Sequence, residues 1–221
     1  MSQGDPAAIS PQLASLRKDY ALKTLEEAQV DRDPLKQFGV WMVEAIHAQV
    51  PEPTAMTLST ADARGRPSGR IVLLKGVDPR GFVFFTNYES RKGQELLANP
   101  HAALLFHWDT LGRQVRIEGP AERVGQEESA KYIRSRPRGS QMSALASPQS
   151  RHVESRAALE RLVAELEALS ADGELPLPEH WGGIRVRPEL YEFWQHREDR
   201  LHDRLVYTPE GDGWTIARLA P

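Results

Sequence analysis

The chain has 221 residues, 40% of them apolar and 27% charged, which is the composition of an ordinary globular protein. Its formal net charge of −3 argues against a general nucleic-acid-binding protein, and the absence of cysteine excludes disulfides and thiolate chemistry. No run reaches the ~18 apolar residues of a membrane span and no signal peptide is recognisable, so we expect a cytoplasmic protein without a membrane partner.

The N-terminal 32 residues are polar and weakly periodic, which predicts a mobile arm over residues 1–32. Asp33 and Pro34 then have the form of a helix N-cap followed by proline at the first helical position. Apolar residues at helical spacing predict a helix that buries one face and ends before Pro51; they are Leu35, Phe38, Trp41, Met42, Ala45 and Ile46.

Short β-rich runs separated by turn-forming residues follow, at 54–60, 69–75, 81–87, 102–108 and 113–119. Because so little chain separates them, they favour an antiparallel barrel over a doubly wound parallel sheet. Short helices are expected at 90–98 and 127–135, and an amphipathic helix at 154–169. Further strands are expected at 183–194, 204–207 and 214–218. The predicted fold is mainly β with flanking helices, and without a repeat or linker we expect one domain over residues 33–221.

Two segments place basic residues where an anion would bind. The sequence Asn-Tyr-Glu-Ser-Arg-Lys at 87–92 lies between a strand and a helix, so backbone amides, Arg91 and Lys92 would form an anion site. A capped helix with two solvated cations explains the same residues. Arg70 and Lys75 flank an apolar run and, within one strand, would point to opposite faces; there they would serve two anions or remain solvated.

The densest basic stretch, residues 131–140, combines cations with hydroxyl donors, as a phosphate site requires. A solvated helix end is the alternative reading. Further along, His202 lies between Arg200 and Arg204 at alternating strand positions, so all three would face one cavity. A lone histidine is more often structural.

Several site classes lack their signature in this chain. There is no G-x-G-x-x-G or P-loop, so dinucleotide-binding and NTPase readings have no support. The seven histidines show no metal-ligand spacing, so no metal site is predicted, and no G-x-S-x-G nucleophile motif is present.

The chain resembles the pyridoxamine 5′-phosphate oxidase family of flavin enzymes along nearly its whole length. The matching stretches run in order from residue 17 to residue 221: RKDY, DPLKQF, RIVLLK, FTNYESRKGQEL, RQVRIEG, SRPRGSQ, ASPQS, PLPEHWGGIRV, EFWQ, RLHDR and RLAP. The resemblance implies an FMN-binding split β-barrel, antiparallel and of Greek-key type, that forms a homodimer with FMN at the subunit interface.

The resemblance also implies the residues that bind the cofactor. Those matching positions that hold the FMN phosphate and ribityl chain are Arg70, Arg91, Lys92, Gln149 and Ser150. Those matching positions around the flavin ring are Gln114, Trp194 and Arg204, with Phe85 and Thr86 as a further flavin-contacting pair. The strand segment Ile71, Val72, Leu73, Leu74 and Lys75 completes the expected cofactor-binding set.

The implied substrate site is a separate set. Lys75, Tyr132, Arg136 and Ser140 match a clamp on the substrate phosphate, and Arg200 and His202 match residues against the pyridine ring, where they are the expected catalytic pair. Arg17 and Tyr20 match residues that close over the substrate, which would make the N-terminal arm a lid.

The implied reaction is oxidation of pyridoxine or pyridoxamine 5′-phosphate at C4′ to pyridoxal 5′-phosphate by hydride transfer to flavin N5. Oxygen is the acceptor, and the products are H₂O₂ and, from the amine, ammonia. The alternatives are a split-barrel flavin oxidase of another metabolite, such as a phenazine precursor, and a non-enzymatic carrier of FMN or pyridoxal phosphate. Phe85, Glu52 and the pair His196-Arg197 depart from residues common in the family, and we expect them to alter kinetics at most.

Overall fold

The computed structural model describes residues 24–169, 175 and 178–221. Its α-helices are α2 (Pro34–His47), α3 (Arg91–Ala98), α4 (Gln126–Ser135), α5 (Arg138–Ala146) and α6 (Arg156–Leu169). Its strands are β1 (Ala55–Ala61), β2 (Pro67–Leu73), β3 (Gly76–Asp78), β4 (Gly81–Asn87), β5 (His101–Trp108), β6 (Arg113–Arg123), β7 (Trp181–Val186), β8 (Leu190–Gln195), β9 (Asp203–Glu210) and β10 (Gly213–Arg218). Two short 3₁₀ helices are η1 (Asp109–Leu111) and η2 (Glu198–Arg200).

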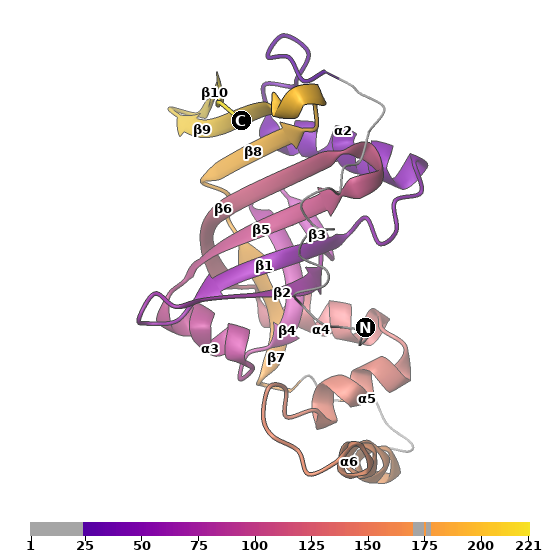
Figure 1. Cartoon of the computed structure of the whole chain (residues 1–221). Helices are drawn as coiled ribbons and strands as arrows, with labels where there is room; N and C mark the ends of the chain where they lie inside the picture. Colours follow the sequence, from indigo (N-terminus) through magenta and orange to yellow (C-terminus); the bar gives the residue numbers. More distant parts are fainter. Residues whose placement is uncertain (1–23, 170–174, 176–177) are drawn as a thin grey trace, which may run out of the picture.

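The strands pair antiparallel throughout and form one curled half-barrel (Figure 1), which confirms the predicted fold class. The main path runs β10-β9-β8-β6-β5-β1-β2, and a branch from β6 continues through β7 to β4 and β3. Helices α4, α5 and α6 gather at the end of the molecule opposite β8 and β9 (Figure 1).

The long strand β6 joins the two parts of the sheet because it changes partner along its length. Its first half pairs with β8, and residues 121–123 pair with β7. At the changeover, a side chain on Gly119 would lie 1.9 Å from the carbonyl oxygen of Arg187, so only glycine fits. The prediction of one strand over 183–194 is wrong. The chain leaves β7 at Arg187 and enters β8 at Leu190, because Pro188 has no amide to continue the ladder.

Helix α2 begins as the sequence predicts, and its apolar face is buried against the sheet. The Asp33 side chain accepts a hydrogen bond from the amide of Leu35, and Pro34 occupies the first turn. Phe38 is 1% exposed and its ring lies edge-on to Phe82 of β4 at 4.9 Å between centroids. Ile46, expected on the same face, is 53% exposed because the helix rotates it away from the sheet.

The described part of the expected N-terminal arm, residues 24–32, is packed against the sheet. Leu25 is 4% exposed in the core, and its backbone carbonyl accepts a hydrogen bond from Arg218 of β10. Residues 1–23, with Arg17 and Tyr20, lie outside the described residues.

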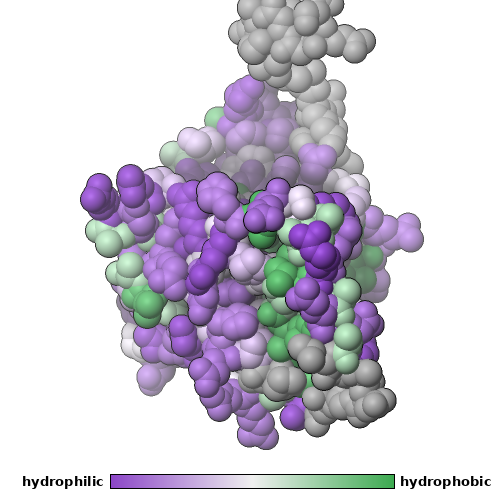
Figure 2. Space-filling view, turned by 90° about the horizontal axis from the view of Figure 1, so that it is seen from below, coloured by the Kyte–Doolittle hydropathy of each residue, from purple (hydrophilic) through white to green (hydrophobic). Residues whose placement is uncertain are grey.

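Two elements differ from the expected outline at the other end. The sequence did not predict α5, whose residues were read only as part of a basic stretch. Helix α6 keeps its apolar stripe only partly covered, and Leu162 is 42% exposed. Seen from this end, the surface is mostly hydrophilic, with a band of apolar residues (Figure 2). None of the described helices is long and apolar enough to cross a membrane.

Candidate active site

A cavity of about 450 Å³ lies between strands β2, β4 and β7 and helices α3, α4 and α5. Many of the residues expected for cofactor and substrate line it together: Ile71, Val72, Leu73, Lys75, Phe85, Thr86, Lys92, Tyr132, Arg136 and Gln149. Four further lining residues had no expected role, namely Ser143, Ala144, Ser147 and Trp181. Segments far apart in sequence thus meet around one concave surface of the size that small ligands occupy.

Stacked aromatic rings form one wall of this cavity. Phe85 of β4 stacks on Tyr132 of α4 at 3.7 Å between centroids, and Trp181 of β7 lies parallel to Phe85 at 5.6 Å. The guanidinium of Arg136 lies 5.4 Å from the centre of the Trp181 ring, within cation–π range. Gly183 makes room for the stack, since a side chain there would come within 3.0 Å of Phe85. Trp181 belongs to the quoted stretch PLPEHWGGIRV. The two glycines that follow it were the sequence signal by which its place in the cavity wall could have been found.

A cationic corner forms where α3 begins. Ser90 caps the helix by accepting the amide of Gly93, and the Lys92 ammonium donates to Ser90 at 3.2 Å and to Gln149 Oε1 at 2.7 Å. Burial, and then the nearby charge of Arg70, lower the pKa of Lys92 to about 8. A helix N-terminus with a half-buried ammonium favours an anion, as the sequence predicts.

Arg70 and Arg91, expected at the same corner, are both held by Glu95 of α3 and do not line the cavity. Arg70 Nη2 lies 3.1 Å from one carboxylate oxygen and Arg91 Nε lies 2.8 Å from the other. Burial would raise the pKa of Glu95, but hydrogen bonds from two hydroxyls and Arg91, with the charge of Arg70, outweigh it and lower the pKa to about 2. The carboxylate therefore stays ionised and keeps both arginines beside the helix N-terminus.

The remaining residues expected near the cavity differ in their surroundings; they are Lys75, Leu74, Ser140 and Ser150. Lys75 is exposed, and its ammonium forms no hydrogen bond or ion pair with any described residue. Strand β2 ends at Leu73, so the alternation argument for Arg70 and Lys75 does not extend to Lys75. Leu74 is 8% exposed in the core, Ser140 lies in α5, and Ser150 has a left-handed backbone with φ 70°.

The three residues expected around the flavin ring lie in register across three other strands. Gln114 of β6 is opposite Trp194 of β8, which is opposite Arg204 of β9. The Arg204 guanidinium donates two hydrogen bonds to the buried carboxylate of Glu192, at 2.8 and 3.1 Å. Glu192 raises the pKa of Arg204. A paired guanidinium with N–H groups to spare is a rigid donor.

His202 stands beside Trp194 with 4.6 Å between ring centroids. Its Nδ1 accepts the backbone amide of Arg197 at 3.1 Å, which places the proton of the neutral ring on Nε2. Burial is the largest cause of a lowered His202 pKa, with the charges of His196 and Arg200 adding to it. His202 is therefore a neutral hydrogen-bond donor at pH 7.

Arg200 is exposed at the end of η2, and its guanidinium bonds to no described residue. Its backbone and that of Asp199 are both left-handed, with φ 60° and 52°. Two consecutive non-glycine residues in this region cost free energy, and such strain concentrates at ligand sites.

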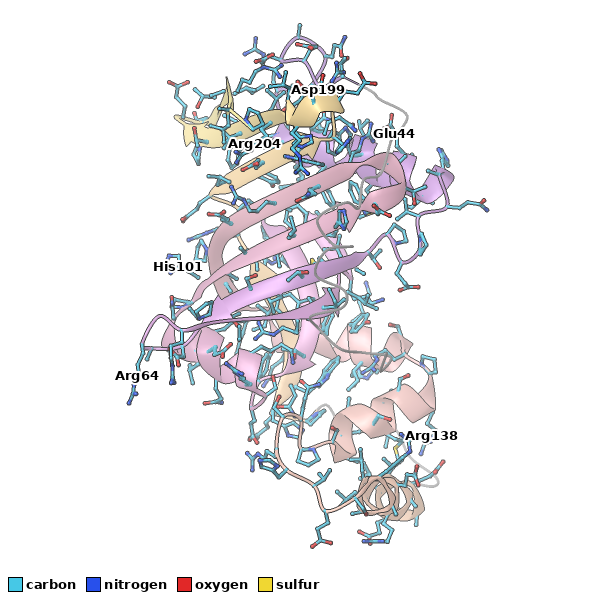
Figure 3. The ribbon with its side chains drawn as sticks, viewed as in Figure 1. Glu44, Arg64, His101, Arg138, Asp199 and Arg204 are labelled. Atoms are coloured by element: carbon cyan, nitrogen blue, oxygen red, sulfur yellow. The ribbon has the colours of Figure 1, made fainter. Side chains whose placement is uncertain are left out.

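The residues that line the cavity and the group around Trp194, Arg204 and His202 lie apart within one chain. From β2 to β8 the sheet runs through four strand spacings, which is roughly 19 Å. In Figure 3, Arg204 lies at the β8–β9 end and Arg138 at the far end, on α5. One chain therefore presents the cavity and the group around Trp194 as separate surfaces.

Comparison with known proteins gives the family. Residues 42–170 match the family model described as pyridoxamine 5′-phosphate oxidase, and residues 181–221 match the pyridoxine 5′-phosphate oxidase C-terminal dimerisation region. The chain is 60% identical over 210 residues to the pyridoxine/pyridoxamine 5′-phosphate oxidase of Paraburkholderia phymatum, covering 95% of this chain and 99% of that protein. It is 55% identical to the protein of the same name from Rubrobacter xylanophilus, over 98% of this chain and all of that one.

Solved structures agree with this assignment. PhzG from Burkholderia lata 383, solved with tetrahydrophenazine-1-carboxylic acid, superposes with a TM-score of 0.84 at 34% identity, covering 91% of this chain and 100% of that one. An FMN-binding protein from Nostoc punctiforme, 16% identical, shares the fold with a TM-score of 0.65 over 82% of this chain and 96% of that one. By sequence, by fold and by the residues that line its cavity, the chain belongs to the pyridoxamine 5′-phosphate oxidase family.

Proposed function

We propose that this protein is an FMN-dependent oxidase that converts pyridoxine or pyridoxamine 5′-phosphate to pyridoxal 5′-phosphate with O₂ as acceptor. The observation that carries the proposal is the chemistry of the cavity. It combines a wall of stacked aromatic rings with the cations of Lys75 and Arg136 and the hydroxyl of Tyr132. A flat heteroaromatic ring with a phosphate arm is complementary to both features.

The residues present also fit FMN. The corner formed by Lys92, Gln149 and the N-terminus of α3 suits a phosphate, and the apolar segment 71–73 suits the body of a flavin. Lys92 is half-buried with a lowered pKa, so it gains most from an anion. When bound, FMN supplies the redox chemistry, accepting two electrons from the substrate and passing them to O₂.

The chain's own residues bind and orient. Lys75, Tyr132 and Arg136, with Ser140 nearby, hold the substrate phosphate and so position the reacting carbon. The free guanidinium of Arg200 covers the pyridine ring, and the Nε2–H group of His202 donates a hydrogen bond to a ring substituent. Arg204, fixed by Glu192, provides a positive charge that need not move as negative charge develops.

We further propose that each site is completed by a second copy of the chain. The cavity residues and the group around Trp194 lie on separate surfaces of one protomer, and the matched dimerisation region contains β8, β9 and Arg200. In a two-fold dimer the partner's β8–β9 region would face this protomer's cavity and enclose FMN between the subunits. The location in the cytoplasm stays a prediction.

Mixing two inactive variants tests the shared site. Lys75→Ala and Arg200→Ala proteins would be unfolded together, refolded and assayed for aldehyde formation from pyridoxine 5′-phosphate. A heterodimer with sites between subunits contains one intact site, so a random mixture recovers about one quarter of wild-type activity. Refolding each variant alone is the control. Recovery no greater than that of the separate variants would show that each site lies within one chain.

Turnover of pyridoxine 5′-phosphate by the FMN-loaded protein tests the activity itself. Aldehyde that depends on both FMN and O₂ is the expected result. A phenazine-type carboxylic acid carries no phosphate, so it would leave Lys75, Tyr132 and Arg136 without a ligand. Oxidation of such an acid, with none of the phosphorylated vitamer, would instead favour the PhzG-like reading, and flavin binding without turnover of either would indicate a carrier.

A further inference from the structure

A buried arginine, Arg185, links two residues that do not line the cavity, Asp78 and Glu128. Arg185 of β7 is 3% exposed. Its Nη1 donates to Asp78, at the end of β3, at 2.6 Å, and its Nη2 lies 3.0 and 3.2 Å from the two carboxylate oxygens of Glu128. A guanidinium is costly to bury unless its donors are satisfied, so this link is strongly maintained once formed.

Glu128 stands in the first turn of α4, the helix that carries the expected phosphate ligands. Tyr132 follows it four residues later on the same helix face, and Arg136 is the extended residue that directly follows the helix as its C-cap. Tyr132 stacks on Phe85 at 3.7 Å and Arg136 lies over Trp181 at 5.4 Å. The ion pair therefore holds one end of α4, and the two cavity residues lie further along the helix and at its other end.

Two neighbouring residues, Glu128 and Ser129, hold the start of α4 in place. Its N-cap is Gly125, which provides no side-chain hydrogen bond. Ser129 accepts the amide of Gly183 at 3.1 Å, and Ile133 is 2% exposed against the sheet. These contacts hold the helix against β7, and the contact of Arg185 Nη2 with both carboxylate oxygens of Glu128 adds a further restraint on its rotation and on its position along the strand.

We infer that Glu128 and Arg185 are positioning residues for phosphate recognition, acting through α4 on Tyr132 and Arg136. The inference rests on the proposed function, since it assumes that these two side chains bind the substrate phosphate. Neither Glu128 nor Arg185 lines the cavity. Loss of the link lets α4 shift and weakens binding of the phosphate, while the ring-binding residues Arg200 and His202, in the connection between β8 and β9, are unaffected.

Glu128→Gln in the FMN-loaded protein is the direct test, because Asp78 still pairs with Arg185 and the buried guanidinium is not left unpaired. Binding of 4-deoxypyridoxine 5′-phosphate and of 4-deoxypyridoxine would be followed by the change in flavin absorbance. Neither compound has an oxidisable or aldehyde group at C4′. We expect about fivefold weaker binding of the phosphorylated compound and an unchanged constant for the other.

The sign of this effect separates positioning from simple charge. Removing a carboxylate near a phosphate site would strengthen anion binding if only long-range electrostatics acted. Glu127→Gln is the matched control: it is exposed in the same turn and loses the same charge at the same helix end, yet has no contact with Arg185. We expect its phosphate selectivity to stay within twofold of wild type. Glu128→Asp keeps the charge but has a shorter side chain. We expect its loss of binding of the phosphorylated compound to be about half that of Glu128→Gln.

The outcomes distinguish the two levels of the proposal. A lower melting temperature in Glu128→Gln with unchanged selectivity for the phosphorylated compound would give Arg185 and Glu128 a structural role only and overturn the inference. An equal loss in Glu127→Gln would overturn it as well. If the wild-type protein itself does not prefer the phosphorylated compound, the proposed substrate phosphate site fails, whatever the variants show.

Discussion

The cavity wall and the β8–β9 surface treat their cations in opposite ways. In the cavity, Lys75 has no partner among the described residues and Lys92 is half-buried with a pKa lowered to about 8. On the other surface, Arg204 of β9 is already paired with Glu192 of β8, and His202, just before β9, has a lowered pKa and is neutral at pH 7. Arg200 is the exception there, exposed on a strained backbone. The cavity is thus built to gain binding energy from anions, and the other surface to hold rigid donors in place.

The largest expected effect falls on Arg200, where this contrast is sharpest. Arg200→Ala should lower turnover at saturating substrate by about 100-fold, because it removes the donor that we propose covers the substrate ring. The dissociation constant for FMN should change by less than twofold. Steady-state kinetics and a flavin titration measure the two quantities. Equal losses in both would contradict the assigned role.

Lys92→Gln should produce the reverse pattern. It removes a charged donor from the proposed phosphate corner, and we expect FMN affinity to fall by about 30-fold. Turnover of protein saturated with FMN should stay close to wild type. Riboflavin, which has no phosphate, provides the control in fluorescence titrations. If riboflavin binding falls as much as FMN binding, Lys92 does not hold the phosphate.

The lowered pKa of Lys92 predicts a pH dependence of FMN binding by the apoprotein. A bound phosphate favours the ammonium and raises its pKa, so above the free value of about 8 binding takes up a proton. FMN affinity should be nearly level between pH 7 and 8 and then decline by at most about tenfold per unit as pH rises. Titrations from pH 7 to 9.5 measure this, and Lys92→Arg should abolish the decline.

His202 predicts a smaller effect with its own pH signature. Protonation of His202 would remove the Nδ1 acceptor that holds its ring. Because the pKa of His202 is lowered from its ordinary value of 6.5, kcat/KM should stay level from pH 8 down to pH 6.5 and fall at lower pH. His202→Gln should lower kcat/KM by about tenfold and lose this contribution. The variant also controls for ionisation of the substrate phosphate near pH 6. An identical acid limb in both proteins would exclude His202 as its source.

Phe85→Tyr should have the smallest effect. The ring is half-buried and stacks on Tyr132, so an added hydroxyl has room only at the cavity edge. We expect kcat to change by no more than about threefold and FMN affinity to change even less. A tenfold change in kcat would show that this departure from the family pattern is functionally important.

Local patterns were sufficient to predict much of the fold. The Asp33-Pro34 cap located α2, and β-rich runs located β1, β2, β4, β5 and β6 to within a few residues. These signals succeed because capping and side-chain alternation act between residues that are close in sequence. The division of 183–194 into two strands had a local signal in Pro188, which has no amide for the ladder, but nothing local reports that β6 changes partner there.

Ten of the residues that line the cavity were expected from the sequence, but their arrangement was not, and their binding roles stay predictions. Family resemblance identified Lys92 and Gln149, and the structure brings them to 2.7 Å from 57 positions apart. Family resemblance gave no role to Trp181, whose importance depends on a stack with two rings from other elements. Family resemblance also did not show that Glu95 holds both Arg91 and Arg70. The Arg91 pair is local to α3, at i and i+4, whereas the Arg70 pair exists only once α3 packs beside β2.

The sequence by itself determined most of the elements, the family and the residue types expected to bind ligands, because each follows from short-range preference or from a linear motif. Only the tertiary structure decided that these groups divide into two surfaces, and that Arg185 joins Asp78 and Glu128 from 107 and 57 positions away. The physical reason is that strand pairing and burial are settled by the whole chain at once. A charged side chain acquires its partner, and so its function, from the packing that encloses it.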